Sequence, residues 1–308
     1  MTTRRFVSSV VAGVAILIAA HGAALRGQTA AAPGFDSPEA AVRALIDAAQ
    51  QDAMGPIVAL FGAEGRNLVD TTDPEAARRN RATFVAAAAE GWQLEEDGAQ
   101  RRLLIVGNER WPFPVPLVQT EGRWRFDAAA GREEVIARRI GRNELTAIRV
   151  SRLYVAAQRL YAKTGHDGQP PGAYARRLHS DPGTQNGLYW KAARGETRSP
   201  IGDLLAGAAR DGKAGPEAGA PFHGYYFRIL TAQGAAAAGG AADYVRDGRL
   251  TGGFALVAWP AMYDVTGIMT FVVNQDGVVQ EKDLGPDTDA IVDRMRAYDP
   301  GEGWSEVP

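Results

Sequence analysis

Residues 132–163 read REEVIARRIGRNELTAIRVSRLYVAAQRLYAK and decide the fold, because they form the longest stretch with helical periodicity. Apolar residues recur there at spacings of three and four, which predicts an amphipathic helix packed on a large surface. The apolar stripe consists of Val135, Ile136, Ile140, Leu145, Ile148, Tyr154, Ala157, Leu160 and Tyr161. Gly141 is expected to break this helix, because glycine disfavours helical backbone. We therefore expect two domains, residues 35–140 and residues 141–308, that meet at this glycine.

Before this stretch the periodicity changes from helices to strands. Helices are predicted over residues 38–51, 54–61 and 73–89, and strands over residues 92–98, 102–106, 113–118 and 124–126. Ser37 is the expected N-cap of the first helix, and Pro38 suits its first position. Helices followed by a curled antiparallel sheet make an α+β domain. Its plan resembles the cystatin and nuclear-transport-factor-like folds.

After this stretch the chain is rich in loops and then returns to strands. A short helix is predicted over residues 174–179 and a final one over residues 286–298, with strands over residues 225–230, 253–258, 269–273 and 278–282. The expected second domain is also α+β, with the long helix packed on an antiparallel sheet. This plan is similar to the globular part of type IV pilin-like and pseudopilin proteins. Pilus assembly is not expected, because a pilin's helix is N-terminal and hydrophobic, whereas this one is internal and amphipathic.

The N-terminus has the pattern of a secretory signal peptide. A basic start with Arg4 and Arg5 precedes the apolar or small residues Val10–Ala20, and an alanine-rich tail follows. This apolar run is shorter than the ~20 residues of a membrane-spanning helix. Residues 1–30 are therefore predicted to be removed on export, which predicts a periplasmic or secreted protein. Membrane association is expected only through an uncleaved signal segment. The cleavage site and the choice between general and twin-arginine export stay open.

Composition narrows the possible chemistry. The chain has no cysteine, which excludes disulfides, a thiolate nucleophile, cysteine-ligated metals and a lipid-modified N-terminal cysteine. The formal charge is −2, and it falls to −5 when the three arginines of residues 1–30 are removed. Since phosphate backbones are bound by concentrated positive charge, nucleic acid is not an expected partner.

Several phrases of the chain match one family. They are WPFPVPLV (111–118), GRWRFD (122–127), RRIGRNEL (138–145), GLYW (187–190), FHGYYFR (222–228), GFALVAWP (253–260) and DLGP (283–286). In these the chain resembles the uncharacterised bacterial exported proteins grouped as domain of unknown function 2950. The resemblance covers nearly the whole mature chain. It implies no activity.

Aromatic residues give the best argument for a binding surface. Trp and Tyr combine a rigid face with one hydrogen-bonding group, which suits protein interfaces and sugar stacking. The candidates for ligand or partner binding are Trp190, Tyr225, Tyr226, Trp259 and Tyr263. The competing interpretation is that alternate members fill the core.

No catalytic or metal-binding set is evident. The chain has no Gly-x-Ser-x-Gly elbow, and the loop at residues 163–168 keeps only Asp167 of a calcium pattern. His166 and His179 are expected to be solvated loop residues. We therefore predict no metal, no cofactor and no catalytic residue, with His223 as the alternative.

Two functional hypotheses follow. The first is a non-enzymatic envelope module that acts through contacts with an envelope protein partner. The alternative is a hydrolase or small-ligand-binding protein with a pocket near His223 and Tyr225.

Overall fold

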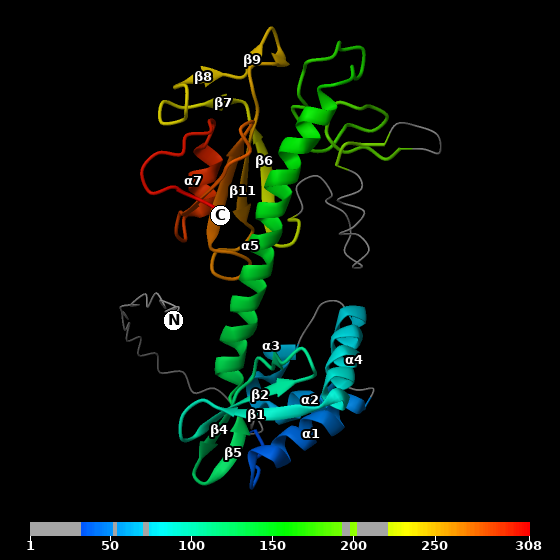
Figure 1. Ribbon diagram of the computed structural model, residues 1–308, viewed down its shortest axis with the longest axis vertical. Coiled ribbons are helices and arrows are strands. Elements are labelled where there is room, and N and C mark those ends of the chain that lie inside the picture. Colours follow the sequence, from blue (N-terminus) through cyan, green and yellow to red (C-terminus); the bar gives the residue numbers. More distant parts are fainter. Residues whose placement is uncertain (1–31, 52–53, 70–73, 193–197, 202–220) are drawn as a thin grey trace, which may run out of the picture.

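The computed structural model consists of two lobes joined by one long helix (Figure 1). The structure describes residues 32–308 except residues 52–53, 70–73, 193–197 and 202–220. The predicted signal peptide, residues 1–30, lies outside the described residues. Both lobes combine helices with an antiparallel sheet, so the predicted α+β class is confirmed.

Helices form one layer of the N-terminal lobe. They are α1 (Pro38–Gln50), α2 (Gly55–Leu60), the 3₁₀ helix η1 (Gly62–Glu64), α3 (Gly65–Val69) and α4 (Pro74–Glu90). The Ser37 hydroxyl accepts a hydrogen bond from the Ala40 amide at 3.2 Å, which confirms the predicted N-cap. α1 then packs against α2, α4 and the last strand of the sheet.

The sheet of the N-terminal lobe has five antiparallel strands. They are β1 (Trp92–Glu96), β2 (Arg101–Val106), β3 (Trp111–Pro112), β4 (Leu117–Thr120) and β5 (Arg123–Phe126). Their order is β1-β2-β4-β5, with β3 also paired to β2. Of the strand predicted over residues 113–118, only residues 117–118 lie in a strand, β4, because Pro114 and Pro116 have no N–H to donate to a ladder. The core includes Leu104 and Leu117, both fully buried.

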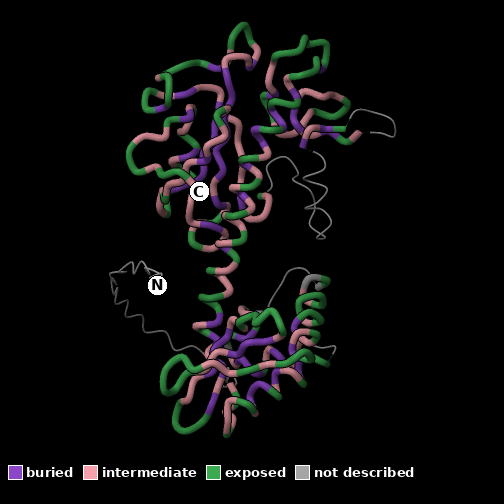
Figure 2. Tube along the Cα trace, viewed as in Figure 1, coloured by how far each residue is buried: buried purple, intermediate pink, exposed green. Residues whose placement is uncertain are grey.

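The long helix α5 (Ala128–Tyr161) connects the lobes without a break. Its N-cap is Asp127, whose carboxylate accepts a hydrogen bond from the Ala130 amide at 3.1 Å. The predicted interruption at Gly141 is wrong, because one internal glycine costs a helix only about 1 kcal/mol relative to alanine. Figure 2 shows that the part of α5 between the lobes is mostly intermediate or exposed, in contrast to the buried residues within each lobe.

The buried face of α5 differs from the predicted apolar stripe. It includes Ala147, Ser151, Tyr154, Gln158 and Tyr161, which follow one another at helical spacing. Leu145 and Leu160, predicted to face inward, are 66% and 52% exposed. Ser151 and Gln158 can be buried on this face because their polar groups have hydrogen-bond partners. The Ser151 hydroxyl donates to the Ala147 carbonyl at 2.8 Å, and Gln158 bonds the backbone of Ala175.

The C-terminal lobe is built on a second antiparallel sheet. Its strands are β6 (Tyr225–Leu230), β11 (Ala255–Pro260), β12 (Met269–Asn274), β13 (Val279–Asp283) and β14 (Ser305–Glu306), in the order β14-β13-β12-β11-β6. α5 packs mainly on β12, and α7 (Thr288–Arg294) packs on β11. The final helix is thus shorter than the predicted residues 286–298. The core of this lobe includes the fully buried Phe254, Leu256 and Phe271.

Two small hairpins, which were not predicted from the sequence, lie beyond this sheet. One pairs β7 (Ala232–Gln233) with β8 (Ala242–Asp243), and the other pairs β9 (Val245–Arg246) with β10 (Arg249–Leu250). The helix predicted over residues 174–179 is wrong: Tyr174 instead forms an isolated bridge with Leu250. Among the described helices, none has both the length and the hydrophobicity of a transmembrane span.

Candidate functional site

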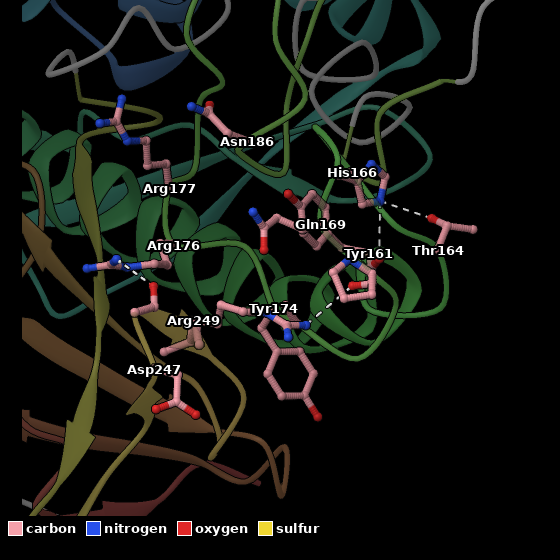
Figure 3. A pocket seen from close by; sticks show the side chains of 14 residues that line it. Tyr161, Thr164, His166, Gln169, Tyr174, Arg176, Arg177, Asn186, Asp247 and Arg249 are labelled. Atoms are coloured by element: carbon pink, nitrogen blue, oxygen red, sulfur yellow. Dashed lines mark hydrogen bonds between the residues drawn. The ribbon is translucent and has the colours of Figure 1, made fainter.

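A pocket of about 570 Å³ lies in the C-terminal lobe, where α5 ends (Figure 3). Its volume falls within the roughly 300–1,000 Å³ that is typical of small-molecule sites. The lining residues are Tyr161, Thr164, His166, Gln169, Pro170, Ala173, Tyr174, Arg176, Arg177, Asn186, Asp247, Gly248, Arg249 and Leu250. They come from the end of α5, the loop that follows it and the β9–β10 hairpin, which are distant in sequence.

One wall of the pocket is fixed by Gln158 of α5. The Ala175 amide donates to Gln158 Oε1, and Gln158 Nε2 donates to the Ala175 carbonyl, each at 2.8 Å. Ala175 is buried, and its neighbours Tyr174 and Arg176 line the pocket. A polar residue of the long helix thus holds this loop at a defined distance from the core.

The second wall is the β9–β10 hairpin. Its turn residues Asp247 and Gly248 have φ values of 48° and 73°, as a type I′ turn requires at both central positions. Arg176 Nη1 donates to the Gly248 carbonyl at 3.1 Å, which links the two walls. The turn places Arg249 in the pocket lining immediately after it.

Stacked rings contribute to the lining at the end of α5. The His166 ring lies 4.0 Å from the Tyr161 ring at an interplanar angle of 17°. His166 is 8% exposed and its Nε2 lies 3.1 Å from the Tyr161 carbonyl, so the prediction of a solvated loop residue is wrong. Burial raises the pKa of Tyr161 to about 12, with a contribution from Asp167. The Tyr161 hydroxyl therefore stays protonated at neutral pH, and it donates to the Gln185 carbonyl at 2.8 Å.

Positive charge dominates the pocket lining. Arg176, Arg177 and Arg249 contribute three guanidinium groups against the single carboxylate of Asp247. Arg177 pairs with Asp181, which does not line the pocket. Among the residues that the structure describes, Arg249 makes no ion pair.

Arg249 is the least satisfied of the three arginines. Its Nη2 lies 3.5 Å from the Pro170 carbonyl, at the limit of hydrogen bonding (Figure 3). Its Nε is buried and has no hydrogen-bond partner in the described part of the chain. A buried donor without a partner is unusual in a protein and calls for an explanation.

Two of the predicted aromatic residues belong to the core. Tyr225 is fully buried and Trp190 is 7% exposed. The Tyr225 hydroxyl donates to the Met269 carbonyl at 2.9 Å. Burial raises the pKa of this hydroxyl, and the carboxylates of Glu144 and Glu281 add to the rise. Trp190 lies beside the pocket, with its ring 5.6 Å from that of His166.

The other three predicted aromatic residues are half-buried. The rings of Tyr226 on β6 and Trp259 on β11 lie 5.6 Å apart, because these residues are paired across the two strands. Trp259 Nε1 donates to Asp289 at 2.7 Å. Tyr263 lies on the loop after β11 and donates to Asp283 at 3.3 Å. Tyr226 and Trp259 are thus a pair of candidates whose rings lie together.

The other predicted histidines lie outside this pocket lining. His223 has a left-handed φ of 47°, and its ring lies edge-on to Phe222 at 4.5 Å. His179 lies edge-on to Tyr189 at 5.6 Å. Among the described residues, no three His, Asp or Glu side chains converge as a metal site requires.

The arginines of the pocket and the role of Gln158 were not predicted from the sequence. Residues 245–250 read VRDGRL, and Asp-Gly between flanking apolar residues is a strong hairpin signal that would have placed Arg249 after a turn. No comparable signal marks Gln158, whose partner Ala175 is known only from the folded chain.

The sequence profile of one family, described as "Protein of unknown function (DUF2950)", matches residues 33–307. No curated protein and no solved structure matches the chain. The likenesses to cystatin, nuclear-transport-factor-like and pilin-like folds therefore stay predictions.

Proposed function

Since the chain belongs to the DUF2950 family, whose description names no activity, we propose its function from its geometry: it is an exported envelope protein that binds a small molecule. The observation that carries the binding proposal is the pocket of about 570 Å³ at the end of α5. It replaces the pocket expected near His223 and Tyr225, neither of which lines it.

The construction of this pocket supports binding. Its walls are tied to the core by hydrogen bonds from Gln158 and to each other by the Arg176 contact with Gly248. Pre-formed walls reduce the conformational entropy that the protein loses when a ligand binds. The Tyr161 hydroxyl is protonated and engaged in a hydrogen bond, which favours a structural role over a catalytic one.

Filling the pocket tests this proposal independently of ligand charge. The purified protein would be screened by thermal shift against neutral and charged sugars, amino acids and nucleosides. Ala173 lines the pocket, and Ala173→Trp should abolish every stabilising shift. Ala156 is exposed on α5, so Ala156→Trp should leave these shifts unchanged. The proposal fails if no compound binds, or if the filled pocket still binds.

Export is supported by the sequence of residues 1–30, a basic start followed by a short apolar run. The full chain should be found in the periplasmic fraction or the medium, and a variant without residues 1–30 in the cytoplasm. Mass spectrometry of the mature N-terminus would show whether cleavage follows Gly22, Gly27 or Ala30. Full-length protein in the cytoplasm would contradict export.

Contact with an envelope protein is a second proposal, favoured by the aromatic pair Tyr226 and Trp259, which is half-exposed at the β6 edge of the sheet. Crosslinking in intact envelopes should capture a partner, and Tyr226→Ser should reduce the yield. The matched variant Tyr189→Ser changes another half-buried tyrosine on a different segment, and it should leave the crosslinking yield unchanged. Recovery of the uncrosslinked monomer alone would contradict this proposal.

A further inference from the structure

We propose that the ligand of this pocket carries an anionic group, a carboxylate or a phosphate, and that Arg249 is the residue that binds it. This inference rests on the proposed function, because it specifies the ligand class of the same pocket. Three separate features of the described residues support it: an incompletely bonded guanidinium, the balance of charge in the lining, and the way in which the arginines are held.

The first feature is the hydrogen bonding of Arg249. A guanidinium has five N–H donors in a planar fork, and this fork matches the two oxygens of a carboxylate or phosphate. The only hydrogen bond of this fork that the described residues show is the 3.5 Å approach of Nη2 to the Pro170 carbonyl. Its Nε is buried without a partner. The outer nitrogens of the fork make no other hydrogen bond among the described residues, so a bound anion would supply the acceptor that they lack.

The second feature is the balance of charge. Arg176, Arg177 and Arg249 exceed the one carboxylate of the lining, Asp247, by two formal charges. The Arg177 charge is partly neutralised by Asp181, whereas Arg176 and Arg249 form no ion pair within the described ranges. A cationic ligand would be repelled by this excess, and a neutral ligand would leave it without a counter-charge.

The third feature is pre-organisation. Arg176 is held by its bond to Gly248, and Arg249 follows directly after that turn, so the same hairpin sets the position of both residues in the pocket lining. Lys would offer a flexible point charge, whereas Arg offers a rigid planar donor set. The expected ligand is therefore a small anion held by directed hydrogen bonds, which makes its binding sensitive to the geometry of the donors as well as to charge.

Simple anions provide the test. Inorganic phosphate and citrate would be titrated into the full mature protein at low ionic strength, with glucose as the neutral probe, and binding followed by calorimetry and thermal shift. At least one anion should bind saturably at millimolar concentration. Arg249→Gln should weaken that binding roughly tenfold or more, and Arg249→Lys should restore only part of it. The stronger of the two anions identifies the preferred group.

The matched control is Arg246→Gln. Arg246 lies opposite Arg249 in the same hairpin, is exposed and does not line the pocket. This variant removes the same charge from the same element, so its anion affinity should stay within about twofold of the parent. Circular dichroism of each variant would establish that the hairpin lobe remains folded.

Three results would overturn the inference. If neither anion binds at 50 millimolar, roughly the weakest affinity measurable by these methods, the ligand class is wrong. If Arg246→Gln weakens binding as much as Arg249→Gln, the loss of affinity comes from the change in overall charge and not from a contact of Arg249 with the anion. If only neutral compounds of the screen bind, and Ala173→Trp abolishes their binding, the ligand class is wrong while the proposed function stands.

Discussion

The side-chain amide of Gln158 connects three parts of the C-terminal lobe. It bonds both backbone groups of Ala175 and donates to the Tyr154 hydroxyl at 3.0 Å. Tyr154 in turn donates to the Ala255 carbonyl of β11 at 3.1 Å. The long helix, the sheet and the pocket wall are therefore linked through one fully buried residue.

Replacing this amide should destabilise the protein and loosen the pocket together. Gln158→Leu keeps the volume but leaves the Ala175 amide and carbonyl buried without partners, so we expect a loss of about 2–4 kcal/mol in the free energy of unfolding. Urea denaturation measures this. Gln93→Leu changes an exposed glutamine on β1 and should stay within about 0.5 kcal/mol. Equal effects of the two variants would contradict the assigned network.

Glu281 on β13 gives a pH-dependent prediction. Burial raises its pKa above the ordinary value of 4.5, and the nearby Glu144 carboxylate adds to the rise. The folded state therefore binds this proton more tightly than the unfolded state does. The resulting contribution to stability is present below pH 4.5 and is lost as pH rises through the raised value.

At pH 7 the ionised carboxylate of Glu281 thus destabilises the folded state, and Glu281→Gln should raise the free energy of unfolding. The gain is expected to be less than about 1 kcal/mol, because the group is partly exposed and water screens it. It should vanish at pH 4 and below. Glu306→Gln, an exposed position on β14, is the control that should show no such gain. A gain that grows on acidification would contradict the assigned pKa direction.

Among the elements, α5 offers a test at the glycine that was expected to end it. A Cβ added at Gly141 meets no atom within 4 Å, and the residue is inside a continuous helix. Gly141→Ala should therefore stabilise the protein by about 0.5–1 kcal/mol through helix propensity and a less flexible unfolded chain. Thermal and urea denaturation measure the gain.

Gly267 is the matched position for this substitution. A Cβ there would lie 2.1 Å from the Tyr225 hydroxyl oxygen, which is buried in the core. Gly267→Ala should therefore destabilise the protein, by about 1–3 kcal/mol for an overpacked site. If Gly141→Ala destabilised as well, α5 would not be a continuous helix at that position.

The elements that local sequence signals define were predicted well. Ser37 and Pro38 fix the start of α1, and neither the alternation of β1 nor the continuous apolar run of β2 needs a distant partner to be recognised. The structure of residues 174–179 was predicted wrongly, because helical spacing of apolar residues there is overruled by the bridge of Tyr174 to Leu250 and the bonds of Ala175 to Gln158. Both partners are distant in sequence.

The same limit applies to the candidate site. The aromatic candidates were chosen for their residue types, and Tyr225 and Trp190 proved to be core residues. The pocket depends instead on arginines brought together by a turn at residues 247–248 and by the end of α5. Residue type and spacing indicate chemistry only when the elements that carry the residues are adjacent along the chain.

At the scale of the whole molecule, the two lobes have separate cores. Leu104 belongs to the core of the N-terminal lobe and Leu256 to that of the C-terminal lobe, and the two clusters share no residue. Between them, residues 132–146 of α5 are largely intermediate or exposed (Figure 2). A continuous helix therefore connects two regions that can lose packing independently.

Truncating one leucine in each core tests this independence. Leu104→Ala and Leu256→Ala remove equivalent, nearly fully buried side chains, so each should cost about 2–5 kcal/mol. Hydrogen exchange followed by mass spectrometry should show faster exchange in residues 38–126 for the first variant and in β11 and β12 for the second. Because the pocket is tied to the C-terminal core through Gln158, only Leu256→Ala should also weaken ligand binding. Faster exchange in both lobes of either variant would show instead that α5 couples them into one cooperative unit, and the pocket would then depend on the N-terminal lobe as well.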